Sequence, residues 1–251
     1  MKITISKENY LKTIAEAESE GEAVIAATLA RWLRISPPAV TAGVHRLKRD
    51  GLIGVTKGGR IQLTQPGREI ADRVLHRHHL IERMLAEMFG MEWYKVHDEA
   101  ELLEHAVSED FEQKLVAALG SGKTCPHGNA VGSDTPQDRR ARGWTPLDEV
   151  NSPGHFQLVS VYERDRQLME FLDGLGLKPG VCFSWVGRNY DETVTLSVTG
   201  RPVQVGAPVA KRVWVTASQL TGDSPCGNAE QPAQGSQPKS RSGRARRVQQ
   251  S

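Results

Sequence analysis

The first fifty residues carry apolar positions at helical spacing in three short segments. The first segment covers residues 7–20, and the second covers about residues 24–33. Ser36 precedes two prolines and starts the third, because serine is a good N-cap and proline is tolerated in the first helical turn. Gly51 ends this segment, as a glycine after a helix commonly does. The pattern therefore predicts three consecutive helices.

The period then changes to the alternation of a β-hairpin. Strands are predicted at residues 53–55 and 60–63, with Thr56-Lys57-Gly58-Gly59 as the turn between them. A long helix is predicted from Thr64 to about Met88. Helix, tight turn, helix and two-stranded wing is the order of a winged helix-turn-helix domain.

The remainder of the chain changes character twice. One helix is predicted over about residues 98–119, and the Gly-, Pro-, Asp- and Arg-rich residues 120–153 predict an irregular connection. Beyond Phe156 the pattern is that of a small β-barrel with one helix at about 164–175 and strands at 181–186, 193–198 and 211–215. Residues 218–251 have almost no large apolar side chains and a basic end, which predicts a disordered tail.

Composition narrows the class of protein but does not name it. Hydrophobic residues make up 38% of the 251 residues and charged residues 25%, enough for real cores but without an apolar run that could cross a membrane. The N-terminus lacks the apolar stretch of a secretory signal, and three widely spaced cysteines indicate a reducing compartment, so a cytoplasmic location is expected. The net charge of +2 does not by itself indicate a nucleic-acid binder.

The third predicted helix has one apolar face and one small and basic face. Val40, Val44 and Leu47 would anchor it on the core, which turns the other face outward. Small residues at its N-terminal end allow close approach to base edges, and basic residues reach phosphates. The alternative is a solvated basic face on an ordinary three-helix bundle. The residues expected to contact DNA are Ser36, Pro38, Ala39, Thr41, Ala42, Arg46, Arg49, Lys57 and Arg60.

Imidazole and carboxylate side chains gather on the next two predicted helices. His78 and Glu82 are four residues apart on the first. On the second, at about 100° per residue, four such side chains fall within roughly 80–100° of arc; these are His97, Glu101, Glu104 and His105. Mixed carboxylate and imidazole ligands suit borderline-hard ions such as Mn²⁺ and Fe²⁺. The alternative is a solvated acidic face with partly buried histidines.

The sequence contains no HExxH pattern, no nucleophile elbow and no phosphate-binding glycine loop, and Gly58-Gly59 is explained as a hairpin turn. We therefore expect no enzymatic activity and assign no catalytic residue.

Several segments together resemble the diphtheria-toxin-repressor family, which includes iron-dependent and manganese-dependent regulators. The resemblance extends from Ile5 to about Val131. It is carried by Asn9-Tyr10-Leu11, Ser36-Pro37-Pro38-Ala39-Val40-Thr41, Arg49-Asp50-Gly51-Leu52, Leu63-Thr64-Gln65-Pro66-Gly67, His78-His79-Leu80-Ile81-Glu82-Arg83 and the segment from His97 to His105, and Cys125-Pro126-His127-Gly128-Asn129 is also family-like.

The resemblance implies a mainly α chain with a small β domain. Its parts would be a winged helix over residues 1–72, a helical metal-binding and dimerisation domain over 73–120, a linker over 121–153, an SH3-like domain over 154–217 and a basic tail over 218–251. It also implies a homodimer that binds palindromic double-stranded operators and represses metal-uptake genes in response to Mn²⁺ or Fe²⁺, with Zn²⁺ or Co²⁺ as substitutes in vitro.

The resemblance further implies two metal sites. The primary site would use Asn9, Glu101, Glu104 and His105, and the ancillary site His78, Glu82, His97, Cys125 and His127, completed by Glu163 or Asp165. Asn9 departs from the Met or Asp of the family, and Lys12 stands where some manganese regulators have a carboxylate ligand. The carboxylate of Glu101, in place of the cysteine of iron sensors, favours Mn²⁺. These departures keep open the alternative of a winged-helix regulator that no longer senses metal.

Overall fold

A computed structural model describes residues 3–120, 122, 124–130 and 134–218 of the chain. The predicted disordered tail lies outside these residues from position 219 onward. Within the described part, no helix is both long enough and apolar enough to span a membrane.

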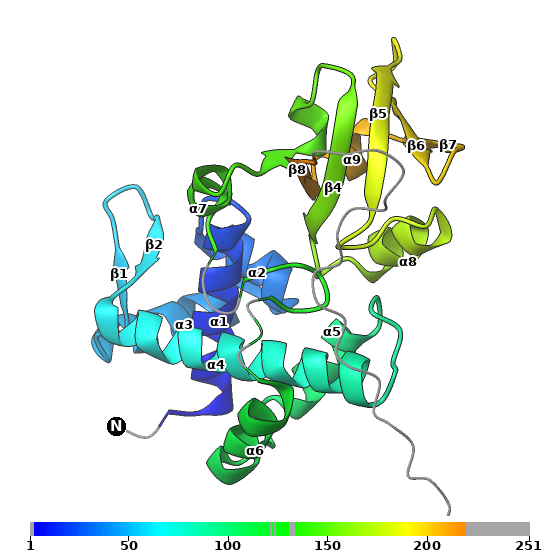
Figure 1. Ribbon diagram of the computed structural model, residues 1–251. Coiled ribbons are helices and arrows are strands. Elements are labelled where there is room, and N and C mark those ends of the chain that lie inside the picture. The colour runs from blue at the N-terminus through cyan, green and yellow to red at the C-terminus, as the bar shows by residue number, and fades with distance from the viewer. Residues whose placement is uncertain (1–2, 121, 123, 131–133, 219–251) are drawn as a thin grey trace, which may run out of the picture.

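The N-terminal part has the predicted winged helix-turn-helix order. Helices α1 (Ile5–Ser19), α2 (Ala26–Leu33) and α3 (Pro37–Arg49) precede a hairpin of β1 (Ile53–Val55) and β2 (Ile61–Leu63). The strands pair antiparallel with Ile53 opposite Leu63. Apolar positions of all three helices and the hairpin form one core that includes Leu11, Ile14, Leu29, Val40, Leu47 and Ile61. The wing stands at one side of the molecule, away from the large sheet (Figure 1).

The seat of α3 on this core depends on a glycine that the pattern did not single out. Val40 and Leu47 are buried as predicted, whereas Val44 is only half-buried. Gly43 is buried instead, and a Cβ there would lie 2.4 Å from the ring of Tyr10. Tyr10 also donates a hydrogen bond of 3.1 Å to the carbonyl of Ala39. The Tyr10 side chain on α1 therefore holds the first turns of α3 in place.

The central helices differ from the sequence prediction at one point. Helix α4 (Gln65–Arg83) is capped by Thr64, whose hydroxyl accepts from Gly67 N, and continues as the π-helical turn η1 (Met84–Met88). The prediction of a single helix over residues 98–119 is wrong, because two separate helices lie there, α5 (Val96–Leu103) and α6 (Glu109–Leu119). Ser108 caps α6 by accepting from Phe111 N, so residues 104–108 turn between the helices. Glu104 and His105 therefore lie at a helix end.

The irregular connection predicted over 120–153 is also partly wrong. Helix α7 (Pro136–Ala141) lies within it, followed by β3 (Thr145–Pro146) and the short 3-10 helix η2 (Leu147–Glu149). A capping box between Thr135 and Asp138 starts α7. Arg139 of this helix is buried and paired with Asp134 and Glu20, which fastens the segment to the end of α1.

The C-terminal part is an antiparallel six-stranded sheet in the order β3-β8-β4-β5-β6-β7. Its elements are β4 (Gly154–Val161), α8 (Arg166–Gly174), β5 (Cys182–Arg188), β6 (Val194–Val198), β7 (Arg201–Val205), α9 (Ala207–Ala210) and β8 (Val213–Ala217). The sequence pattern missed β7, which contains Pro202 and lies at an edge of the sheet, where proline is tolerated. The expected fold class, mainly helical with a small SH3-like β domain, is confirmed.

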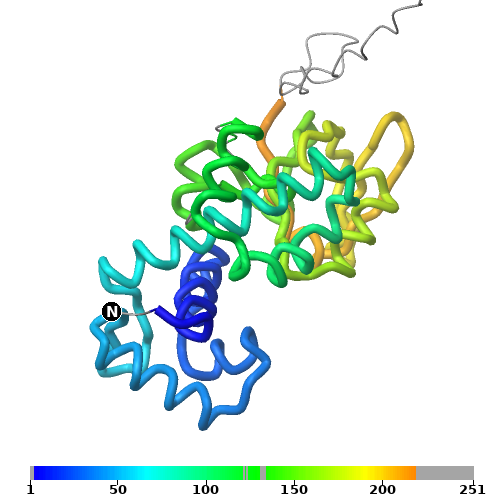
Figure 2. Tube along the Cα trace, turned by 90° about the horizontal axis from the view of Figure 1, so that it is seen from below, coloured from blue at the N-terminus to red at the C-terminus, as the bar shows by residue number. Residues whose placement is uncertain are grey.

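The three parts meet around α1 and α4. In Figure 1, α4 crosses the middle of the molecule with the sheet above it and α6 below it, and Figure 2 shows the winged helix and the sheet at opposite ends. Tyr162, just after β4, packs against the cores of both the sheet and the winged helix. Its ring meets Trp32 of α2 edge-on, with centroids 6.3 Å apart. The C-terminal domain therefore rests directly on the DNA-binding domain.

Candidate metal centre and nucleic-acid surface

A buried cluster of ligand-type side chains lies where α4, α5, a loop and the end of β4 meet. We call it the Glu82 cluster; its members are His78, His79 and Glu82 from α4, His97 from α5, Cys125 and His127 from the loop, and Glu163 after β4. His78 Nε2 lies 2.9 Å from Glu82 Oε1, and His97 Nδ1 lies 3.1 Å from the same oxygen. His78 and Glu82 on α4 and His97 on α5 therefore lie together, as their spacing along the two helices predicted.

The loop brings its two ligand-type side chains to the same carboxylate. His127 Nδ1 lies 3.4 Å from Glu82 Oε1 and 3.5 Å from Glu163 Oε2. Cys125 Sγ lies 3.5 Å from Glu163 Oε2. The expectation that Cys125 and His127 contribute here is thus matched by their positions. Of the two acidic residues considered to complete the set, Glu163 is in the cluster, whereas Asp165 caps α8 and pairs with Arg212.

Backbone and side-chain contacts with β4 hold this loop in place. Gly128 has φ +83°, and a Cβ there would collide with the carbonyl of Val159 at 1.8 Å, so only glycine permits the approach. Val161 N donates to the carbonyl of His127 at 3.0 Å. Asn129 donates to Glu163 and accepts from Ser160, each at 2.5 Å. The loop and Glu163 are therefore positioned as one unit.

His127 is oriented for use of its Nδ1 atom. Its Nε2 atom donates to the carbonyl of Trp93 at 2.8 Å. A backbone acceptor on one ring nitrogen is the usual device that fixes the tautomer and orientation of a metal-binding histidine. The other nitrogen of His127 faces Glu82, Glu163 and Cys125.

The charges in the Glu82 cluster stabilise one another in the metal-free chain. Burial alone would raise the pKa of Glu82, but the facing His127 and His78 outweigh it and hold that pKa well below its usual range. Conversely, burial disfavours the charged form of His127, while Glu82 and Glu163 raise its pKa well above the ordinary value. Burial and the charges of both carboxylates raise the pKa of the Cys125 thiol.

The donor set fits a divalent metal ion. In the described chain, two sets of four side chains have ligand atoms that all lie within 4.8 Å of one another, and both sets belong to the Glu82 cluster. The first set is His78, Glu82, His97 and Glu163, and the second is His79, Glu82, Cys125 and Glu163. Glu82 Oε2 is buried without a hydrogen-bond partner among the described residues, as are both ring nitrogens of His79, apart from a 3.7 Å approach to Glu163. Buried polar atoms without partners are uncommon, and an ion bound in the cluster would give these atoms a partner.

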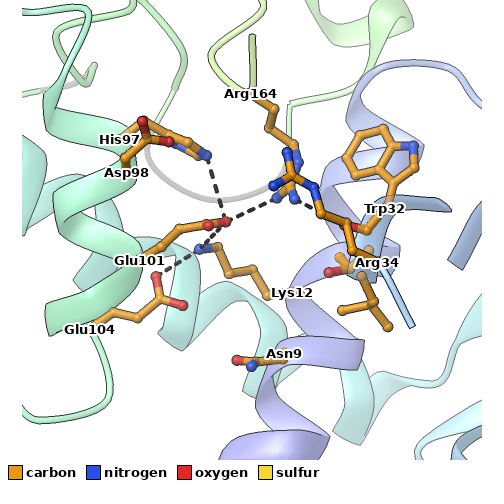
Figure 3. Close-up of a pocket in the computed structure, with 11 residues that line it drawn as sticks. Asn9, Lys12, Trp32, Arg34, His97, Asp98, Glu101, Glu104 and Arg164 are labelled. Carbon is orange, nitrogen blue, oxygen red and sulfur yellow. Dashed lines mark hydrogen bonds and ion pairs between the residues drawn. The ribbon is translucent and has the colours of Figure 1, made fainter. Parts of the chain in front are cut away.

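A second polar cluster lies between α1 and the end of α5 and differs in its cations. We call it the Lys12 cluster; it contains Asn9, Lys12 and Glu16 from α1, Glu101, Glu104 and His105, and Arg164 from the segment before α8. Lys12 Nζ donates to Glu104 Oε2 at 2.7 Å and lies 3.8 Å from Glu101 Oε1. Figure 3 shows the ammonium group between these two carboxylates.

Arg164 neutralises the outer side of the Lys12 cluster. Its Nη1 atom lies 2.7 Å from Glu16 Oε2 and 3.2 Å from Glu101 Oε1. The guanidinium also lies over the ring of Trp32 at 5.0 Å. Glu101, Trp32 and Arg164 line an open cavity of about 260 Å³, together with Asn9 and His97 (Figure 3). One arginine of the C-terminal domain thus contacts both other domains, and neither Arg164 nor His79 was singled out by sequence spacing.

The remaining predicted ligands of the primary site face one another rather than Glu101. His105 Nε2 lies 2.5 Å from Asn9 Oδ1, and its Nδ1 atom lies 2.9 Å from Glu8 Oε2. Glu104 Oε1 is 3.4 Å from His105 Nε2. The structure therefore brings Asn9, Glu104 and His105 together as expected, but turns Glu101 toward Lys12 and Arg164.

Glu104 is held as an anion by its neighbours. Burial would raise its pKa, yet the hydrogen bond from His78 and the charge of Lys12 lower it to about 2. His78 lies between the two clusters, with Nδ1 at 2.6 Å from Glu104 and Nε2 facing Glu82. Burial and Lys12 would lower the pKa of His78, but Glu82 and Glu104 raise it to about 9. This imidazole therefore joins the two clusters electrostatically.

The predicted DNA-facing residues all lie on the exposed face of α3 and the wing. Each of the nine is exposed: Ser36, Pro38, Ala39, Thr41, Ala42, Arg46, Arg49, Lys57 and Arg60. Arg46 and Arg49 are in the last turns of α3, and Lys57 and Arg60 are in the hairpin turn. This is the placement that groove and phosphate contacts require.

Comparison with known proteins gives the family. The sequence matches the iron dependent repressor N-terminal DNA binding domain over residues 2–59, the iron dependent repressor metal binding and dimerisation domain over 64–131, and the FeoA domain over 145–217. It is 40% identical over 217 residues to the diphtheria toxin repressor of Corynebacterium glutamicum, covering 83% of this chain and 94% of that protein. The chain belongs to the diphtheria toxin repressor family.

Members on both the iron and the manganese side of the diphtheria toxin repressor family are similar to this chain. The iron-dependent repressor IdeR of Mycobacterium tuberculosis is 41% identical over 124 residues, which is 49% of this chain and 54%, about half, of IdeR. The structure of the manganese regulator SloR matches with a TM-score of 0.70 at 29% identity, covering 86% of this chain and all of SloR. A manganese-dependent transcriptional repressor in complex with manganese matches with a TM-score of 0.75 at 27% identity, over 84% of this chain and 99% of that structure.

Proposed function

We propose that this chain is a metal-dependent transcriptional repressor that binds a palindromic operator in double-stranded DNA as a homodimer. The observation that carries the proposal is the Glu82 cluster, built within a diphtheria toxin repressor fold beside an exposed recognition helix. The regulated genes would be those for metal-ion uptake, by analogy with the family. We also propose a cytoplasmic location, because a transcriptional repressor acts where the DNA is.

The proposed metal site is the Glu82 cluster. Its candidate ligands are His78, Glu82, His97, Cys125, His127 and Glu163, all of which are nine-tenths or more buried. A divalent ion bound there would supply positive charge to two buried carboxylates. Carboxylate and imidazole ligands favour Mn²⁺ or Fe²⁺, and we propose Mn²⁺ because the set includes two hard carboxylates and a single thiol. Zn²⁺ and Co²⁺ would substitute in vitro.

The way in which this chain could couple metal to DNA follows from which domains supply the residues. Glu163 belongs to the C-terminal domain, whose neighbouring Tyr162 and Arg164 contact Trp32 of the DNA-binding domain. His78, through Glu104, reaches Lys12 on α1, the helix against which Tyr10 seats α3. A metal ion bound in the Glu82 cluster would therefore favour one arrangement of the domains. If DNA binds the same arrangement, metal raises the affinity for DNA and DNA raises the affinity for metal by the same factor.

The homodimer is supported by apolar side chains that the single chain leaves exposed. They lie on η1, α5 and α6 and in the turns between them: Met88, Phe89, Leu102, Leu103, Phe111 and Val116. A contiguous exposed apolar patch marks an association surface, and we propose that these side chains form one. Two recognition helices could then sit about one DNA turn apart on a palindromic site.

The test is operator selection from random DNA with Mn²⁺, with anaerobic Fe²⁺ and with chelator, followed by measurement of affinity on the selected site. We expect retention with metal, and a loss of at least about tenfold in affinity with Arg46→Ala, which removes a groove-facing cation. Sequence-specific binding that is the same with metal and with chelator would instead support a winged-helix regulator that no longer senses metal, an alternative that the lysine in the Lys12 cluster favours.

A further inference from the structure

Lys12 occupies a position that a cation from solution would otherwise be expected to fill. Its side chain is 4% exposed, and its ammonium group lies within 4 Å of three carboxylates. The distances from Nζ are 2.7 Å to Glu104, 3.7 Å to Glu16 and 3.8 Å to Glu101. The same atom is 3.1 Å from His78 Nδ1. No other side chain contacts both Glu101 and Glu104 among the contacts recorded for the described residues.

The four ligands expected between α1 and α5 do not meet around one centre, because Glu101 is turned away from Asn9, Glu104 and His105. Among the His, Cys, Asp and Glu side chains of the described residues, the groups of three or more with ligand atoms within 4.8 Å of one another all belong to the Glu82 cluster. Glu101 is held by Lys12 and Arg164, and both ring nitrogens of His105 face the oxygen atoms of Glu8 and Asn9. Asn9 contributes a neutral amide where a charged ligand would strengthen binding of a metal ion.

The cations of this cluster are covalently part of the chain. Arg164 pairs with Glu16 and Glu101 on the open side, and Lys12 pairs with Glu104 on the buried side (Figure 3). A metal ion between Glu101 and Glu104 would have to displace the ammonium group from a buried position. The displaced lysine would then lose its partners or remain beside a second positive charge, and both are unfavourable in a buried site.

We propose that Lys12 is a resident cation that replaces a metal ion between α1 and the end of α5, so that the chain binds its divalent ion in the Glu82 cluster alone. The Lys12–Glu104 ion pair then ties the DNA-binding domain to the dimerisation domain whether or not metal is present. This inference rests on the proposed function only in placing an ion in the Glu82 cluster.

The experiment counts Mn²⁺ ions bound to the full chain, by equilibrium dialysis and by the electron paramagnetic resonance signal of free Mn²⁺. The wild type is expected to bind about one ion per chain, and Glu104→Gln, which removes a ligand expected from the family, is expected to leave that number unchanged. Glu82→Gln is expected to abolish binding. Lys12→Gln is expected to gain a second ion, which disappears again when Glu104→Gln is added.

Lys178 supplies the matched control, because it is an exposed lysine on the C-terminal domain. Lys178→Gln should bind metal as the wild type does. If Lys12→Gln loses its circular-dichroism signal and is unfolded, the comparison of wild type with Glu104→Gln decides by itself.

Three results overturn the inference. Two ions on the wild type, one of them lost in Glu104→Gln, would show a metal site beside Lys12 while leaving the proposed regulator intact. A folded Lys12→Gln that still binds one ion would show that Lys12 does not exclude the second. A wild type that binds no ion would overturn this inference together with metal sensing, and operator binding would then separate a metal-independent regulator from a chain that binds no DNA.

Discussion

The Glu82 cluster and the Lys12 cluster contain similar carboxylates and imidazoles, but their positive partners differ in kind. The recorded partners of Glu82 and Glu163 are imidazoles, a thiol and an amide, within the described residues. Those of Glu101 and Glu104 include an ammonium and a guanidinium group. An imidazole can give up its proton when a metal ion arrives and then bind the ion through the freed nitrogen, whereas Lys and Arg have no lone pair to offer while charged.

The comparison teaches that ligand-type residues near one another are not sufficient for a metal site. What matters is whether the compensating charge can leave. In the Glu82 cluster only protons must leave, since the facing imidazoles and the thiol can themselves bind the ion. In the Lys12 cluster a buried side chain must leave, together with its bond to Glu104.

The largest expected effect is on the stability of the metal-free chain when Lys12 is replaced. Lys12→Met removes the lysine partner of the buried Glu104, and loss of one partner of a buried pair costs about 3–5 kcal/mol. We expect the urea midpoint of the chelator-treated chain to fall accordingly, and part of the loss to be recovered in Lys12→Met/Glu104→Gln. Lys178→Met is the control. A midpoint equal to that of the wild type would show that the Lys12–Glu104 pair does not hold the domains together.

The next effect concerns metal affinity at the other cluster. Glu82→Gln removes the carboxylate that three imidazoles face, and we expect Mn²⁺ affinity to fall at least about 100-fold, since even changes in the shell around metal ligands cost about 10–100-fold. Calorimetric titration measures it. The matched control is Glu87→Gln, a few residues along and exposed beside Arg83. Wild-type affinity in Glu82→Gln would move the metal site away from this cluster.

A smaller effect separates metals within the Glu82 cluster. Cys125 is the single thiol there, and burial and the charges of Glu82 and Glu163 raise its pKa, so a metal must displace its proton. Softer Zn²⁺ gains more from the thiolate than Mn²⁺ does. We expect Cys125→Ser to lower Zn²⁺ affinity on the order of tenfold and Mn²⁺ affinity much less. Equal losses for both ions, measured by competition with a chelator, would mean that Cys125 only shapes the loop.

Much of this arrangement followed from the chain pattern. The winged helix, the long α4 and the His78–Glu82 pair follow from local spacing, because helical period alone places residues four apart on one face. The small β domain followed from short strands between glycines and prolines. The edge strand β7 was missed, since Pro202 reads as a loop until its place at the sheet edge is known.

The rest depended on contacts between distant parts of the chain. The break between α5 and α6 was hidden because residues 104–108 contain no proline or glycine, and Ser108 became recognisable as a cap only with Phe111 N beside it. Residues 136–141 lie in a polar segment whose helix is fastened by Arg139 to Glu20. Local patterns carry no information on such pairing.

The same limit applied to the candidate sites. The departure at Lys12 was visible in the sequence, but that its ammonium reaches Glu104, 92 positions away, was not. Arg164 stands at the start of the helix predicted over about 164–175, but its contacts with Glu16, Glu101 and Trp32 arise from domain packing, which helical period does not reveal. Long-range ion pairs of this kind decide which predicted ligands are free to bind a metal.

The smallest expected effect tests whether charge or ligand type limits the Lys12 cluster. Asn9→Asp supplies a carboxylate beside His105, the ligand type that manganese regulators use there by resemblance, yet it leaves Lys12 and Arg164 in place. If the resident cations exclude the ion, Asn9→Asp should change Mn²⁺ affinity less than about threefold, within the range of a partly exposed charge change. The double variant Asn9→Asp/Lys12→Gln should bind the second ion more tightly than Lys12→Gln does, because the site has then lost one cation and gained one negatively charged ligand. A second ion on Asn9→Asp alone would mean that the neutral amide, and not Lys12, had kept the metal out.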